Sequence, residues 1–443
     1  MTNAPKLARR LGAFDATLIV MGGIIGTGIF MNPAVVAARA HTTPLILGVW
    51  LAGGLIAVIG AYIFAELAWR RPSVGGSYGY LRDAYHPVLA FMSGWTSLFV
   101  TNSGSYAATA VTFAIYASPF LHVATVPLAV AVIAVMSGIN CFGVGKGAGV
   151  QNVLMVLKIA AIGGLIAAAL FAPAQVAHAT AVVAPHGLAL IGALGAALLP
   201  VFYSYDGWQT APFMDEELKD PERTLPLGLI WGVLAVVILY IAVTLVSIRV
   251  LGPAGLAASQ APATDVLRLA IGPAGAALMA GCIALSTIGF LSNTALCIPR
   301  LYFAMANDGL FFKQIAYVNP KTQAPVAAIL LQAVVSIVIV LVGKYDQILN
   351  YVTSMDFLYM VLFAGALFIF RARGIRGART GIGVPLHPWS TLLFAGVSLA
   401  VVINSYVAFP KDTLIGLLIL LSGAPIYFIW VRRVLPRAAA IKP

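Results

Sequence analysis

Apolar residues form long runs along the whole chain, and short polar stretches separate them. Twelve of these runs have the length of about 20 residues that an α-helix needs to cross a bilayer. The pattern therefore predicts an all-α membrane protein with twelve transmembrane helices. Their expected centres are near Ile25, Leu55, Thr101, Ala134, Gly163, Pro200, Val237, Ala284, Val335, Met360, Gly396 and Ile419.

The first apolar run, from about Leu11 to Ala38, contains the sequence GGIIGTGIF at residues 22–30. A helix in a bilayer must satisfy its backbone groups internally, so a glycine cluster at this depth predicts a break. The second half-helix would expose N–H groups that bind an anion, and the first half would expose C=O groups that bind a cation. A zwitterionic amino acid would satisfy both.

The sixth run contains a second predicted break, in the sequence FYSYDGW at residues 202–208. Pro200 removes a helical hydrogen bond, and Asp206-Gly207 is a turn-type pair at mid-membrane depth. Such backbone is tolerated only where it lines a cavity, so both breaks point to one site. The role of Asp206 stays open between pairing with a substrate amine, carrying a proton and capping the second half-helix.

Lys158 is the one charged residue of the predicted fifth helix, which runs from about Gln151 to Phe171. A lysine buried among apolar residues is costly, so it indicates a functional site. The alternative is that its side chain reaches the membrane surface, but roughly 10 Å of helix separates it from the end. Asp356, in the tenth helix, is a further buried charge without an evident partner.

Composition and charge agree with this class of protein. Hydrophobic residues make up 61% of the 443 residues and charged residues 9%, with a mean hydropathy of +0.98. Lysine and arginine fall mostly in alternate loops, roughly twenty against five, which predicts cytoplasmic N- and C-termini. This topology accounts for the net charge of +12, so nucleic-acid binding is not expected. We expect no cleaved signal peptide, and the three cysteines lack metal-ligand spacing.

The loop after the second helix carries the motif AELAWRRPSVGGSYGYLRDAYHPVLAFMSGW at residues 65–95. It resembles the helix 2 to helix 3 signature of the amino acid, polyamine and organocation (APC) superfamily. With GGIIGTGIF and FYSYDGW, it is most similar to bacterial relatives of the L-type amino acid transporters. Many members have glycine where this chain has Asp206. The matching residues of the loop are Glu66, Pro72, Gly75, Gly76, Tyr78, Tyr80, Leu81, Arg82, Ala84, Gly94 and Trp95.

The resemblance implies the LeuT-type fold, in which five helices are repeated in inverted orientation. Residues 1–175 would form the first repeat, residues 176–372 the second, and residues 373–443 two additional helices and the C-terminal tail. The two predicted breaks are five helices apart, in agreement with such a repeat. The last two helices could brace the fold or form dimer contacts, so the oligomeric state stays open.

The resemblance also implies roles for individual residues. The substrate carboxylate would bind amides around Gly26, Thr27 and Gly28, and its amine would bind carbonyls around Ile24, Ile25, Tyr203, Ser204 and Asp206. Tyr203 would act as an aromatic gate. The Lys158 ammonium would occupy the place of sodium in related transporters, with the carbonyls of Gly22 and Gly23 and the Ser286 hydroxyl as acceptors.

We therefore expect a sodium-independent secondary transporter of L-amino acids that works by alternating access. Exchange and proton-coupled symport both fit, and the alternative substrate class is a polyamine or another organic cation. An enzyme or a channel is not favoured, because neither paired catalytic groups nor a continuous polar pore is evident. No cofactor, metal or nucleotide site is expected.

The expected surroundings are the lipid bilayer of the plasma (inner) membrane and a small-molecule amino acid substrate. In the eukaryotic L-type transporters, a disulfide from the loop after helix 3 joins a glycoprotein partner. The corresponding loop here, Ser118 to Thr125, has no cysteine. We therefore expect no disulfide-linked heavy-chain partner.

Overall fold

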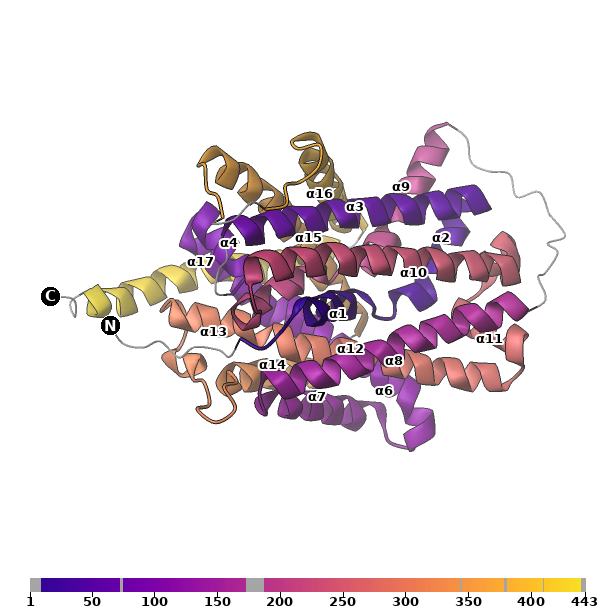
Figure 1. The fold of residues 1–443 in the computed structure, drawn as a ribbon, viewed down its shortest axis with the longest axis horizontal. Coiled ribbons are helices and arrows are strands. Elements are labelled where there is room, and N and C mark those ends of the chain that lie inside the picture. Colours follow the sequence, from indigo (N-terminus) through magenta and orange to yellow (C-terminus); the bar gives the residue numbers. More distant parts are fainter. Residues whose placement is uncertain are drawn as a thin grey trace.

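The computed structural model describes residues 9–71, 75–172, 187–342, 345–377, 381–408 and 410–439. Within these ranges the regular structure is helical, apart from one isolated bridge between Leu11 and Leu218. Long helices run side by side, with α4 and α13 at one end of the molecule and α11 at the other (Figure 1). Pro72 of the loop motif and the expected repeat boundary at residues 175 and 176 lie outside the described residues.

The first predicted helix is interrupted, as expected from its glycine cluster. Helix α1 spans Ala13–Ile24 and α2 spans Gly28–Ala40, and their axes differ by 48°. Residues 25–27 lie outside both helices and join them, with the Ile25 N–H still donating to the Met21 carbonyl (2.8 Å). The second predicted helix is α3 (Thr43–Arg70), which begins with a proline in its first turn, and the short α4 (Ser77–Ala84) follows it.

The third predicted helix contains a local widening. It consists of α5 (Pro87–Thr96), a five-residue π-helical turn η1 (Ser97–Thr101) and α6 (Asn102–Leu121). The chain then reverses into α7 (Thr125–Cys141), at 112° to the preceding helix, and continues as α8 (Val144–Phe171).

The sixth predicted helix is also interrupted, five residues beyond its proline. Helix α9 (Leu188–Tyr205) continues through Pro200 and ends before Asp206, and Gly207 adopts φ 116°. A 3-10 helix, η2 (Trp208–Glu217), follows. The turn-type pair therefore makes the break, because Gly207 can take a left-handed conformation that other residues disfavour.

The remaining helices complete the bundle. Helix α10 kinks at Gly252, and α12 and α13 follow each other almost directly. They are α10 (Pro221–Ala258), α11 (Pro262–Ile271), α12 (Ala274–Cys297), α13 (Pro299–Asn307), η3 (Lys313–Ala316), α14 (Val326–Val342), α15 (Tyr345–Ala372), α16 (Trp389–Ala408) and α17 (Pro410–Ala439).

Seven helices of the described chain are each long and apolar enough to cross a membrane. Two bent pairs, α1 with α2 and the α5–α6 unit with α7, raise that number to nine, whereas α14 is apolar but shorter. The protein is therefore an all-helical, multi-pass membrane protein. The expectation of twelve spans is not decided by this criterion.

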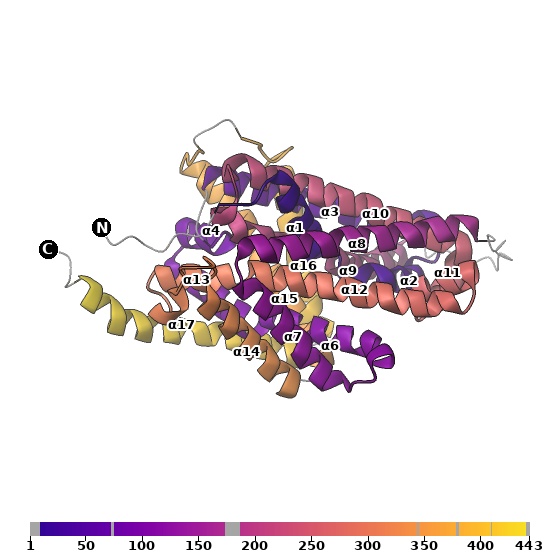
Figure 2. The ribbon, with the colours of Figure 1, turned by 60° about the horizontal axis from the view of Figure 1, so that its bottom comes forward.

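Helix α1 lies inside the bundle. It contacts α8, α10, α12 and η2, and eight of its 12 residues are buried. Helices α8 and α12 lie side by side, as both views show (Figures 1 and 2). The first break is thereby enclosed by helices that are far apart in the sequence.

Candidate substrate site

The two interrupted helices touch at their breaks. A β-carbon at Gly23 would lie 2.6 Å from the carbonyl oxygen of Gly207, and one at Gly207 would lie 2.0 Å from the carbonyl oxygen of Gly23. Neither position has room for a side chain. Glycine at both positions therefore allows the two backbones to meet.

A second contact joins the same helices on the other side of the breaks. A β-carbon at Gly28 would lie 2.8 Å from the Ser204 hydroxyl oxygen. Asn32 donates hydrogen bonds to this hydroxyl (2.7 Å) and to the Pro200 carbonyl (2.9 Å). Asn32 thus ties α2 to α9, a role that sequence reasoning missed because its partners are more than 160 residues away.

A small cavity of about 80 Å³ lies where the two breaks meet. Seven of the residues expected to bind substrate line it: Ile24, Gly26, Thr27, Gly28, Tyr203, Ser204 and Asp206. Ile25 is fully buried and does not line the cavity. Tyr203 lines the cavity and is 42% exposed, so it is accessible there.

Four further residues line this cavity, and the sequence marked only Asp356 among them, as a buried charge. Ser105 and Thr109 come from α6, Phe290 from α12 and Asp356 from α15. Ser105 and Thr109 are four residues apart, so they share one face of a helix, which is a signal that the sequence contains. Phe290 carries no such signal, because an apolar residue in an apolar helix does not mark a site.

Three consecutive carbonyl groups at the first break accept hydrogen bonds from three different helices. The Ile24 carbonyl accepts one from the Tyr240 hydroxyl of α10 (3.3 Å), and the Gly26 carbonyl accepts one from the Ser286 hydroxyl of α12 (2.9 Å). Between them, the Ile25 carbonyl accepts a hydrogen bond from the Lys158 ammonium of α8. Side chains therefore replace the helical bonds that the break removes.

Lys158 is fully buried, and its nearest neighbours explain how an ammonium fits there. A β-carbon at Gly289 of α12 would lie 2.9 Å from the Lys158 Cε, so glycine leaves room for the lysine stem. The acceptor is Ile25, in place of the expected Gly22 and Gly23. Gly22 packs against Gln151, and the Gly23 carbonyl faces Gly207.

Ser286 lies next to the lysine site without bonding the lysine in the structure. Its hydroxyl donates to Gly26, one residue along from the carbonyl that Lys158 binds. Lys158 and Ser286 are thus brought together on adjacent carbonyl groups of the first break.

The carboxylate of Asp206 lies on the cavity wall at the second break. Gln209 donates a hydrogen bond to it (3.0 Å) and accepts one from the Gly207 N–H (2.8 Å). Gln209 therefore bridges the two ends of the break. Asp356, which had no evident partner in the sequence, lines the same cavity from α15.

Both broken helices are anchored at the end of the molecule that carries α4 and α13. The Glu217 carbonyl at the end of η2 accepts hydrogen bonds from the Arg10 and Leu11 N–H groups, and the Lys219 N–H donates to the Leu11 carbonyl. The Glu217 carboxylate pairs with Arg300. The start of α1 and the end of η2 are therefore held together.

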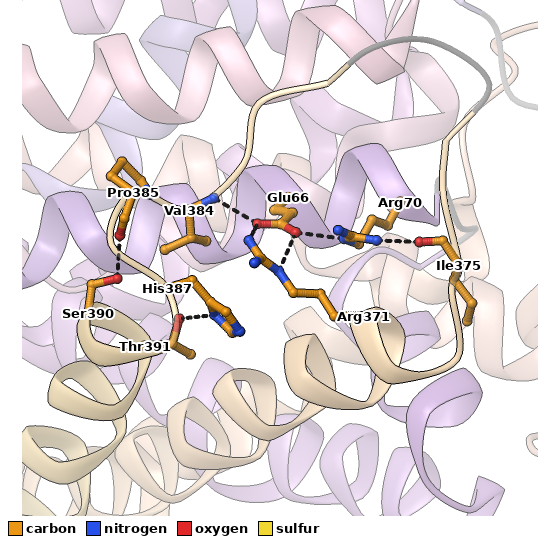
Figure 3. Close-up of polar contacts among 9 residues, drawn as sticks. All are labelled: Glu66, Arg70, Arg371, Ile375, Val384, Pro385, His387, Ser390 and Thr391. Carbon is orange, nitrogen blue, oxygen red and sulfur yellow. Dashed lines mark hydrogen bonds and ion pairs between the residues drawn. The ribbon is translucent and has the colours of Figure 1, made fainter.

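Glu66 is the centre of a second polar cluster at this end (Figure 3). Its buried carboxylate accepts hydrogen bonds from Arg70 (2.7 Å), from two nitrogens of Arg371 (2.6 and 2.8 Å) and from the Val384 N–H (2.7 Å). These contacts join α3, α15 and the segment that leads to α16. These hydrogen bonds and the two arginine charges offset the free-energy cost of burying the Glu66 carboxylate.

A third cluster lies on α4, outside the long helices. Asp83 pairs with Arg71 (2.6 Å) and Arg82 (2.9 Å), and Arg82 also pairs with Asp308. Burial raises the pKa of the Asp83 carboxyl group, but the hydrogen bonds from the two arginines outweigh it and hold that pKa below its ordinary value. Tyr78 donates to Asp308 at 2.9 Å.

The sequence resembles known proteins along nearly its whole length. The sequence model of the amino acid permease family matches residues 11–429. The chain is 28% identical to the mouse b(0,+)-type amino acid transporter 1, over 96% of this chain and 88% of the relative. It is also 28% identical to the serine/threonine exchanger SteT of Bacillus subtilis (strain 168), over 95% and 97% of the two chains.

A third relative is the human large neutral amino acids transporter small subunit 2, 28% identical over 96% of this chain and 81% of the relative. All three matches extend over nearly the whole chain, so they include both broken helices and the cavity between them. The chain is therefore a member of the amino acid permease family, within the APC superfamily.

Proposed function

We propose that this protein is a sodium-independent secondary transporter of L-amino acids that works by alternating access. The observation that carries the proposal is the meeting of two broken helices at one cavity, with the Lys158 ammonium on an open carbonyl beside it. The amino acid transport named for the relatives supports the substrate class.

The chemistry of the cavity suits a zwitterion. Gly26, Thr27 and Gly28 lie where α2 begins, so their N–H groups and the positive end of the helix dipole favour the substrate carboxylate. Carbonyl groups at the ends of α1 and α9 favour the substrate ammonium. Tyr203, at the accessible side of the cavity, would close over the bound substrate.

Lys158 takes the part of a bound sodium ion in this proposal. Its charge lies at the end of α1, where the helix dipole is negative, and its stem belongs to α8. It therefore links the first broken helix to a neighbouring intact one. Loosening this link would let α1 move and open the cavity. Either the exchange of one substrate for another or the loss of the lysine proton would loosen it.

We also propose the topology that fits this function. The protein lies in the plasma membrane, and both termini are cytoplasmic, as the distribution of lysine and arginine favours. Residues 1–175 and 176–372 form the inverted repeats of a LeuT-type fold. The end that carries α4 and α13 is then the cytoplasmic end, and the three polar clusters there hold it closed.

The test is radiolabelled uptake by the purified chain alone in proteoliposomes, with a panel of amino acids and with or without internal substrate and a proton gradient. We expect saturable uptake without a second protein. Methyl esters and decarboxylated amines should compete poorly with the parent amino acids, because they lack the carboxylate. Equal competition by the amines would support a polyamine substrate, and activity only after addition of a second protein would contradict independence from a partner.

A further inference from the structure

A cavity of about 350 Å³ lies between the end of α3 and the start of α10, two helices that run side by side (Figure 1). It shares no lining residue with the substrate cavity, which measures about 80 Å³. Its volume falls in the range of about 300–1,000 Å³ that is usual for small-molecule sites. The lining includes Trp69 of α3, Glu222, Arg223, Pro226 and Leu227 of α10, and Ile382 of the segment that leads to α16.

One wall of this cavity is a stretch of backbone packed on the Trp69 indole. A β-carbon at Gly381 would lie 2.0 Å from the Trp69 ring, and one at Gly377 would lie 2.7 Å from its Nε1. Glycine at both positions therefore allows the chain to approach the indole closely. With Ile382 and Leu227, the indole gives the cavity apolar walls.

Two opposite charges lie beside these apolar walls. Arg223 is exposed and takes part in no ion pair within the described ranges. The Oε2 atom of Glu222 is shielded from solvent and has no hydrogen-bond partner among the described residues. A buried carboxylate oxygen without a donor is costly, so Glu222 favours a ligand with N–H groups. The Arg223 guanidinium suits a phosphate.

The cavity lies where the helices reach the edge of the bilayer. Trp69 is the last residue but one of α3, and Arg223 lies in the first turn of α10. Tryptophan is typical of the membrane–water interface. Leu227 and Trp231 follow on the same face of α10 as Arg223, and Trp231 is 61% exposed. An apolar path therefore leads from the cavity roughly 12 Å towards the middle of the membrane.

We propose that this cavity binds the headgroup of a phospholipid with a primary ammonium group, phosphatidylethanolamine. Arg223 binds the phosphate, Glu222 accepts hydrogen bonds from the ammonium, and an acyl chain lies along Leu227 and Trp231. A choline headgroup has no N–H to donate to Glu222, and a glycerol headgroup has no positive charge. The inference rests on the multi-pass membrane fold and is independent of the transported substrate.

A lipid at this cavity also supports the first broken helix. The neighbouring face of α10 packs against α1: a β-carbon at Gly228 would lie 2.7 Å from the Ala16 Cβ, and one at Gly232 would lie 2.6 Å from the Val20 Cγ1. Because Gly228 directly follows Leu227, a lipid that holds the start of α10 also restrains the surface on which α1 rests. The bound lipid should therefore stabilise the folded protein.

The test is native mass spectrometry of the purified, delipidated protein in detergent. Phosphatidylethanolamine, phosphatidylcholine and phosphatidylglycerol with identical acyl chains are added separately. We expect the wild-type protein to bind phosphatidylethanolamine at least tenfold more tightly than the other two lipids, and its unfolding temperature to rise with this lipid. Arg223→Gln should weaken this binding at least tenfold, and Glu222→Gln should remove the preference over phosphatidylcholine.

Two further variants complete the test. Lys321→Gln removes an exposed positive charge from the loop between η3 and α14, outside the cavity, and should leave binding unchanged. Leu227→Trp fills the cavity without a change of charge and should weaken binding at least tenfold, which tests the site if Arg223→Gln does not fold.

Equal binding of the three lipids by the wild type, or binding that survives the substitutions at Arg223 and Leu227, would overturn the site. Phosphatidylglycerol bound as tightly as phosphatidylethanolamine would overturn the role of Glu222. An unfolding temperature that is unchanged by phosphatidylethanolamine would overturn the support of α1. Since neither measurement involves a substrate, absence of amino acid uptake would contradict the proposed function alone.

Discussion

Arg300 and Glu217 form a buried ion pair in which the Arg300 Nη2 lies 3.0 Å from the Glu217 Oε1. The Arg300 side chain is 2% exposed and that of Glu217 is fully buried. Because the Glu217 carbonyl also binds the Arg10 and Leu11 N–H groups, this pair connects α13 to the ends of both broken helices. The two broken helices that meet at the candidate substrate cavity thus share one anchor.

Removal of one member of this pair should destabilise the protein strongly. Arg300→Met leaves the Glu217 carboxylate buried without its positive partner. Glu217→Gln leaves the Arg300 guanidinium buried without its negative partner. Each should cost about 3–5 kcal/mol of unfolding free energy. The measurement is thermal unfolding of the purified protein in detergent. The double variant should lose less than the sum of the two single losses, and strictly additive losses would show that the pair is not coupled.

The Glu66 cluster allows a test of geometry rather than charge. Arg371→Lys keeps the positive charge but cannot reproduce two parallel hydrogen bonds to one carboxylate. We expect a loss of about 1–3 kcal/mol, measured by the same unfolding assay. Arg373→Lys is the matched control, because Arg373 lies two residues further along and makes one exposed contact with the Asp83 carbonyl. Equal effects of the two variants would contradict a specific role for the paired hydrogen bonds.

Gly289 should be essential for the position of the lysine. In Gly289→Ala the new β-carbon would approach the Lys158 Cε to 2.9 Å, so the ammonium must move away from the Ile25 carbonyl. We expect uptake to fall at least tenfold. Gly281→Ala on the same helix is the control, since a β-carbon there meets nothing within 4 Å. Equal uptake by the two variants would mean that the lysine can adapt without loss of function.

We expect transport to be independent of sodium and to depend on Lys158. Because its ammonium supplies the positive charge at the first break, wild-type uptake should be unchanged when choline replaces sodium. Lys158→Ala should reduce uptake at least tenfold, while size-exclusion chromatography shows a folded protein. Loss of wild-type uptake in choline, or full activity of Lys158→Ala, would refute this role.

Several features could be predicted from the sequence because their causes are local. A long run of apolar residues determines a membrane-spanning helix, and a glycine cluster or an Asp-Gly pair inside such a run determines a break. The interruptions at residues 25–27 and at Asp206-Gly207 follow from this reasoning alone. A single lysine in an apolar helix likewise indicates a functional site, because burying its charge is costly wherever the helix lies.

Contacts between distant helices could not be predicted in the same way. Three contacts depend on how the helices are rotated and spaced. Lys158 binds the carbonyl of Ile25, Tyr240 binds the carbonyl of Ile24, and Gly289 makes room for the lysine. A helical pattern gives the face that a residue occupies, but the rotation and depth of its neighbours follow from packing of the whole bundle. For the same reason, only the tertiary structure places Asp356 and Asp206 on the wall of one cavity.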